Sequence, residues 1–89
     1  MLYRLMRRIW KKEMGIEAEF EDYGNFVRVQ LNFRDLGIEG LIIILEKAKR
    51  YFEGYDLMLW WGQKCCDLYI GEVKVLDQLD LDGISLRVK

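Results

Sequence analysis

The sequence contains no histidine, threonine or proline, and Ser85 is its only serine. Histidine is the side chain that most often transfers protons near neutral pH, and hydroxyl or thiol nucleophiles usually depend on such a base. The carboxylates, lysines and tyrosines that remain show no spacing that would bring two of them together. We therefore expect a protein that is not an enzyme and that uses no cofactor.

Metal and phosphate motifs are missing as well. The adjacent pair Cys65-Cys66, with no histidine and no second cysteine pair, cannot complete a zinc ligand set within one chain. Asp77, Asp80 and Asp82 lack the spacing and the terminal glutamate of a calcium loop. The segment 37–40 has neither the lysine nor the spacing of a phosphate-binding loop. We expect no metal site.

The two cysteines are predicted to lie in a strand, where neighbouring side chains point to opposite faces. We expect Cys66 to be buried with Leu68 and Cys65 to face the side of Trp60. Cys65 is then the one candidate for a redox role, as a disulfide or contact across a dimer interface.

The composition is that of a globular protein: 89 residues, 52% hydrophobic and 33% charged, with a net charge of −1. Residues 1–89 are expected to form one domain. Charged residues are plentiful and uncharged polar ones scarce, which is typical of thermophile proteins, although these often gain proline. Arginines interrupt the first apolar residues, and the apolar run 41–45 is too short to span a bilayer. We expect a cytoplasmic protein without a membrane span.

Residues 1–14 are predicted to form an amphipathic helix that ends at Gly15. Its apolar side holds Leu2, Leu5, Met6, Ile9 and Trp10, and its basic side holds Arg4, Arg7, Arg8, Lys11 and Lys12. The first interpretation is a helix docked on a sheet with its charges in water. The alternatives are contact with nucleic-acid phosphates, a membrane surface or a partner's groove.

Residues 16–34 alternate between apolar and polar side chains around the turn segment 22–25, which predicts a β-hairpin. A register with Phe20 opposite Val27 places Glu19 opposite Arg28. Apolar side chains then pair on one face and opposite charges pair on the other. Glu17, Glu19 and Glu21 form an acidic row that is expected to be a solvated strand face.

Residues 38–61 are the most apolar part of the chain and predict a helix followed by a strand. Asp35 or Gly37 is the expected N-terminal cap, and Gly54 the C-terminal one. The expected buried stripe consists of Ile38, Leu41, Ile42, Leu45, Ala48 and Phe52. Apolar residues off this stripe, and the strand 55–61 with apolar residues on both faces, leave more apolar surface than one copy is expected to cover.

The remaining residues predict a second hairpin, in which the strand 65–70 follows a turn at Gly62-Gln63, then a bend at Gly71. Asp82-Gly83 predicts a turn before a last strand at 84–89, at a sheet edge with Arg87 and Lys89 outward. The order α-β-β-α-β-β-β indicates an α+β fold. We expect a mainly antiparallel sheet of four to five strands with the N-terminal and central helices packed on it.

Two functions follow as hypotheses. The first is a small, non-enzymatic protein–protein interaction module, as found among accessory and inhibitor proteins of viruses and mobile elements. We expect it to form a homodimer and to bind another macromolecule, most readily a protein. The expected interface residues are Ile43, Ile44, Tyr51, Met58 and Trp60. The alternative is nucleic-acid binding through the basic side of the first helix, supported by Arg28 and Arg34 if those surfaces meet.

Overall fold

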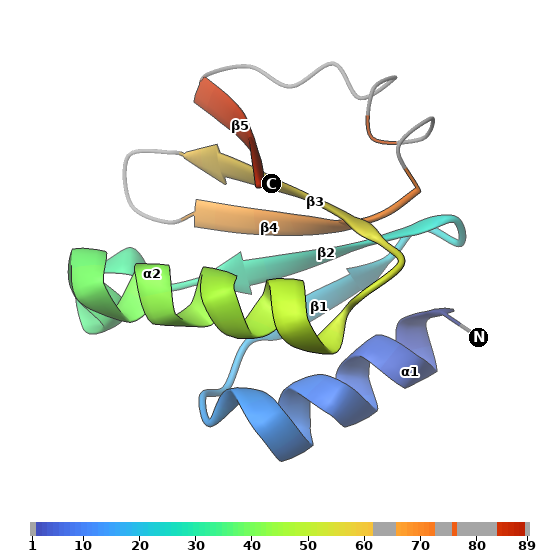
Figure 1. The fold of residues 1–89 in the computed structure, drawn as a ribbon, viewed down its shortest axis with the longest axis horizontal. Coiled ribbons are helices and arrows are strands. Elements are labelled where there is room, and N and C mark those ends of the chain that lie inside the picture. Colours follow the sequence, from blue (N-terminus) through green and yellow to red (C-terminus); the bar gives the residue numbers. More distant parts are fainter. Residues whose placement is uncertain (1, 62–65, 73–75, 77–83, 89) are drawn as a thin grey trace.

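The structure, a computed structural model, describes residues 2–61, 66–72, 76 and 84–88, with only the backbone at 33, 35 and 84–87 (Figure 1). Its elements are α1 (Leu2–Ile9), a π-helical continuation (Trp10–Met14), β1 (Glu19–Asp22), β2 (Phe26–Leu31), α2 (Phe33–Tyr51), β3 (Asp56–Trp61), β4 (Cys66–Gly71) and β5 (Ile84–Val88). The predicted α+β fold and its element order are confirmed.

The five strands form one antiparallel sheet in the order β1-β2-β4-β3-β5. β2 and β3 are joined through α2 but are not neighbours, because β4 lies between them (Figure 1). All six residues of β4 are buried. The sheet therefore ends in β1 on one side and in β5, the predicted last strand, on the other.

One face of the sheet, which we call the helix face, is covered by both helices. In β2 every second side chain is buried, and Val27, Val29 and Leu31 lie opposite Ile70, Leu68 and Cys66 of β4. The same buried cluster contains Met6 of α1, Trp10 of its π-helical continuation, Ala48 of α2 and Phe52 just after α2. The core is thus a helix layer on a sheet layer, and Cys66 is buried as predicted.

The predicted buried stripe of α2 is partly wrong. Ile38 and Ile42 are 66% and 50% exposed, whereas Ile44 is buried beside Leu41. The run 41–45 is apolar on every side of the helix, so its periodicity cannot decide which residues face the sheet. The helix is also interrupted at Gly37 (φ 66°, ψ 179°), and Asn32 caps the turn before it through a hydrogen bond from the Arg34 N–H to Oδ1 at 3.1 Å.

The first hairpin has the predicted faces but a different register. Phe20 lies opposite Val29, and Glu21 rather than Glu19 lies opposite Arg28. The turn is centred on Gly24-Asn25, since Gly24 has φ 85° and its N–H donates to Asp22 Oδ1 at 2.8 Å. Glycine is the residue that suits the first position of such a two-residue turn. The slip of two residues keeps every side chain on its predicted face.

The opposite face of the sheet, which we call the far face, is partly covered by the chain itself. Leu76 is buried against Met58 and Tyr69, with Phe26 and Trp60 packed at the side. The second apolar face of β3 was expected to need a partner, and part of that cover comes instead from a residue beyond β4.

Gly71 ends β4 where it passes close to Phe26. A Cβ atom at position 71 would lie 2.8 Å from Phe26 Cβ, which no ordinary contact allows. The predicted turns at Gly62-Gln63 and Asp82-Gly83, and the orientations of Arg87 and Lys89, lie outside the described residues. Among the helices that the structure describes, none is long and apolar enough to cross a membrane.

Candidate interaction surfaces

The residues predicted to form an interface are not together on the surface. Ile44 is buried in the main core, and Met58 is buried under Leu76 on the far face, so neither of them is surplus surface. Tyr51 and Trp60 are partly buried. Ile43 alone is exposed, at 52%. Both residues are buried by other parts of the same chain. Ile44 faces the main core from α2, and Leu76 packs against Met58.

A larger apolar surface lies on the outside of α2. Ile38 and Ile42 are one helical turn apart and form a row, and Ile43 follows Ile42 on the exposed side. We call these three residues the α2 outer face. Exposed acidic residues come first along this part of the helix, at Glu39 and Glu46, and exposed basic residues follow in its last turn, at Lys49 and Arg50.

The basic side of α1 and its continuation is solvent-exposed as predicted. Its members are Arg4, Arg7, Arg8, Lys11 and Lys12, and none of them forms a salt bridge within the described chain. Arg7 donates a hydrogen bond to the Tyr3 hydroxyl at 3.2 Å, and its guanidinium lies 5.9 Å from the centre of that ring. Leu5, placed on the apolar side by the sequence pattern, is 43% exposed.

Trp10 fixes α1 to the rest of the fold. Its ring lies edge-on to Phe20 of β1 at 5.7 Å and is stacked with Phe52, just after α2, at 6.4 Å. Its indole N–H donates to the carbonyl of Ile16 at 3.1 Å. The basic surface therefore has a defined position relative to the sheet.

A chain of charges crosses three strands on the far face. Arg28 Nε donates to Asp67 Oδ2 and Arg28 Nη1 donates to Glu21 Oε1, both at 2.9 Å. The Asp67 side chain is only 2% exposed, whereas that of Arg28 is 24% exposed. Within the described residues, Asp67 Oδ1 has no hydrogen-bond partner.

These contacts shift the pKa values of the groups involved. Burial alone would lower the pKa of Arg28, but the hydrogen bond and charge of Asp67, followed by those of Glu21, raise it. A hydrogen bond from the Tyr23 hydroxyl, and then that from Arg28, lower the pKa of Glu21. Burial, and then the charge of Asp67, raise the pKa of Tyr69. Arg28 is thus held by carboxylates and is not available to the basic side of α1.

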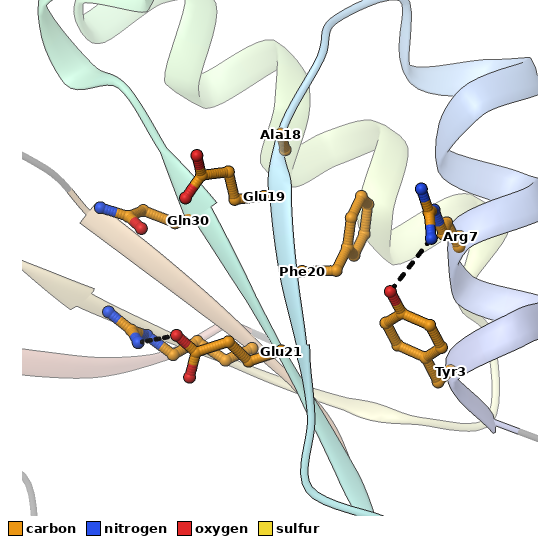
Figure 2. A pocket seen from close by; sticks show the side chains of 8 residues that line it. Tyr3, Arg7, Ala18, Glu19, Phe20, Glu21 and Gln30 are labelled. Carbon is orange, nitrogen blue, oxygen red and sulfur yellow. Dashed lines mark hydrogen bonds and ion pairs between the residues drawn. The ribbon is translucent and has the colours of Figure 1, made fainter.

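One edge of β1 pairs with no other strand among the described residues, and this free edge forms the floor of a groove. Three adjoining hollows share Ala18, and the one drawn in Figure 2 has a volume of about 490 Å³. On one side of the strand Phe20 points toward Tyr3 and Arg7 of α1, and on the other side Glu19, Glu21 and Gln30 point toward the far face (Figure 2). Two neighbouring glutamates, Glu17 and Glu19, are exposed and form no salt bridge with the described residues.

Sequence reasoning missed two of these features. Asp67 was not singled out, because a single aspartate in a strand does not show whether it is buried. The acidic row was noticed but was interpreted only as a solvated face, although its place on the first strand of a hairpin allows it to be an edge. Arg34 is exposed and shares a hollow with Glu17 and Glu19, away from the basic side of α1.

Cys65, the candidate for a redox role, lies outside the described residues, and the described chain holds no group of three potential metal ligands from histidine, cysteine, aspartate and glutamate. Comparison with known protein families, curated proteins and solved structures found no match.

Proposed function

We propose that this chain is a protein–protein interaction module that forms a homodimer through the α2 outer face. The observation that carries the proposal is the exposure of Ile38, Ile42 and Ile43 by half or more of their surface on a helix whose opposite side belongs to the core. Burying an aliphatic side chain of this size contributes about 1.5–3 kcal/mol. A two-fold axis doubles each contact, because both copies present the same residues.

The charges on α2 favour an antiparallel arrangement of the two helices. In that arrangement Glu39 of one copy lies near Lys49 and Arg50 of the other, and the two helix dipoles oppose each other. A parallel arrangement would bring like charges together. The proposed dimer therefore pairs α2 with α2 in opposite directions, with the α2 outer face inside the contact.

The test is sedimentation velocity at micromolar protein concentration. We expect the natural protein to sediment as a dimer and Ile42→Glu to raise the dissociation constant at least about 100-fold, since two carboxylates and their hydration would have to be buried. Leu5→Glu is the matched control, because Leu5 is 43% exposed on α1, outside the proposed interface. A monomeric natural protein, or equal effects of the two substitutions, would contradict the proposal.

The arrangement of the helices has its own control. Glu39→Lys should weaken the dimer about tenfold, because each copy would then oppose a positive charge to Lys49 and Arg50. Adding Lys49→Glu to the same chain should recover most of the loss, as double-mutant cycles do for charges in contact. Additive losses in the double variant would rule out the antiparallel pairing.

Nucleic-acid binding through α1 is a second candidate function. It is favoured by the exposure of all five basic side chains, from Arg4 to Lys12, none of which is neutralised by a salt bridge within the described residues. We expect affinity for duplex DNA at low salt that falls steeply as salt rises, with a slope of about −3 to −4 on logarithmic axes. Arg4→Gln with Arg8→Gln should reduce that slope by nearly two, and Arg50→Gln should leave it unchanged. Absence of binding at low salt would exclude this function.

A further inference from the structure

We propose that the free edge of β1 binds an extended peptide segment of a partner protein, with basic side chains on one face of the segment and apolar side chains on the other. The peptide would add a sixth strand beside β1 and use the backbone groups of β1 that pair with no other described strand. This site is separate from the α2 outer face and does not depend on the proposed dimer.

The backbone of β1 is oriented for such pairing. The Tyr23 N–H donates to the carbonyl of Phe26 at 3.0 Å, which identifies the first hydrogen-bonded pair of the hairpin. In an antiparallel ladder hydrogen-bonded and non-bonded pairs alternate. The register then turns the backbone groups of Glu21 and Glu19 toward β2 and those of Phe20 and Asp22 toward the open edge. Figure 2 looks onto this edge between α1 and the far-face side chains.

The side chains that flank the edge specify the chemistry of the segment. On the far face, Glu19 is exposed and forms no salt bridge with the described residues, and Glu21 keeps only Arg28 and the hydroxyl of Tyr23. Glu17, just before the strand, is also exposed and has no salt bridge within the described residues. On the helix face, Phe20 and Tyr3 present partly exposed rings to the groove. Because side chains of a strand alternate between faces, a strand beside β1 is matched by lysine or arginine at every second position with apolar residues between.

A second copy of the chain does not fit this edge through its own β1. Two β1 strands related by a two-fold axis would place Glu19 and Glu21 of one copy beside the same glutamates of the other, and like charges on neighbouring strands destabilise the pairing. In natural proteins, charged side chains on edge strands often prevent the strand from pairing with another copy in this way. Here the charge excludes β1 itself and leaves a basic segment as the complementary partner.

The proposal is tested with a short, end-capped peptide of alternating lysine and valine, added to the full chain at low ionic strength. Binding is followed by fluorescence anisotropy, and hydrogen exchange is measured residue by residue. We expect binding together with protection of the Phe20 and Asp22 amides, which face the open edge. N-methylation of the peptide along the edge that meets β1 should weaken binding at least tenfold, because it removes backbone donors and leaves the charges unchanged.

Substitutions in the protein give a further check. Glu19→Lys should weaken binding of the lysine–valine peptide at least tenfold and should improve binding of a peptide in which glutamate replaces lysine. Glu53→Lys, an equal charge change at an exposed residue that lines none of the three hollows along the edge, should alter binding less than twofold. The Ile42→Glu variant should bind the peptide with the affinity of the natural protein, because the proposed dimer interface is not part of this site. Absence of binding, equal binding of the N-methylated peptide, or unprotected Phe20 and Asp22 amides would overturn the proposal.

Discussion

Replacing Arg28 with methionine is expected to lower the free energy of unfolding by about 3–5 kcal/mol, the largest effect of any single charge substitution among the described residues. The reason is what the substitution leaves behind. Asp67 is 2% exposed on the central strand β4, and Arg28 is its only ionic partner within the described residues. Without the guanidinium, a carboxylate would remain charged and buried on β4, between Gln30 of β2 and Trp60 of β3.

Replacing the buried partner Asp67 is expected to cost less stability than replacing Arg28. Asp67→Asn removes the charge from the more deeply buried partner, and Arg28 keeps Glu21 at 2.9 Å and a side chain that is 24% exposed. We expect a cost of about 1.5–3 kcal/mol, the usual contribution of a hydrogen bond to a charged group. The double variant Arg28→Met with Asp67→Asn should be more stable than Arg28→Met alone, because no buried charge remains.

Urea denaturation at one protein concentration measures all three variants, since self-association would make the midpoint depend on concentration. A smaller loss for Arg28→Met than for Asp67→Asn would contradict this account of the far face. So would a double variant that loses the sum of the two single effects, because contact between the two side chains requires them to be coupled.

The sequence was sufficient for the elements and for the faces of the strands, since the alternation in β2 and the glycine that ends the first helix are local properties. The predicted caps of α2 were wrong, because Asn32 and not Asp35 or Gly37 is its N-cap, and Phe52 and not Gly54 is its C-cap. It was not sufficient where several choices satisfy the same local pattern. The run 41–45 is apolar all round, so that Ile42 or Ile44 could have faced the sheet. In the first hairpin, a shift of two residues exchanges Glu19 for Glu21 opposite Arg28 without moving any side chain to the other face.

Long-range features were beyond sequence reasoning for a related reason. The position of β4 between β2 and β3, and the return of Leu76 over Met58, depend on contacts between distant segments that no periodicity records. These contacts decide which apolar residues are covered. As a result, the exposed apolar surface is the α2 outer face and not the predicted interface, which included Ile44 and Met58.

Trp10→Ala is the second substitution for which we expect a large effect, a loss of about 3–5 kcal/mol in the free energy of unfolding. Trp10 is 1% exposed and contacts both Phe20 and Phe52, so its removal opens a cavity where α1, β1 and the end of α2 meet. Trp10→Phe should lose less, about 1–2 kcal/mol. It keeps an aromatic ring but leaves the carbonyl of Ile16 without the indole N–H.

Trp61→Ala is the matched control, because Trp61 is 37% exposed at the end of β3 and its removal leaves no enclosed cavity. We expect less than half of the Trp10→Ala loss in urea denaturation, and only Trp10→Ala should accelerate hydrogen exchange throughout α1. Since α1 forms one wall of the β1 groove and, with its continuation, carries the basic residues, Trp10→Ala should weaken binding of both the lysine–valine peptide and DNA. Equal losses for the two tryptophans would show that α1 does not unfold with the core and that its position does not depend on Trp10.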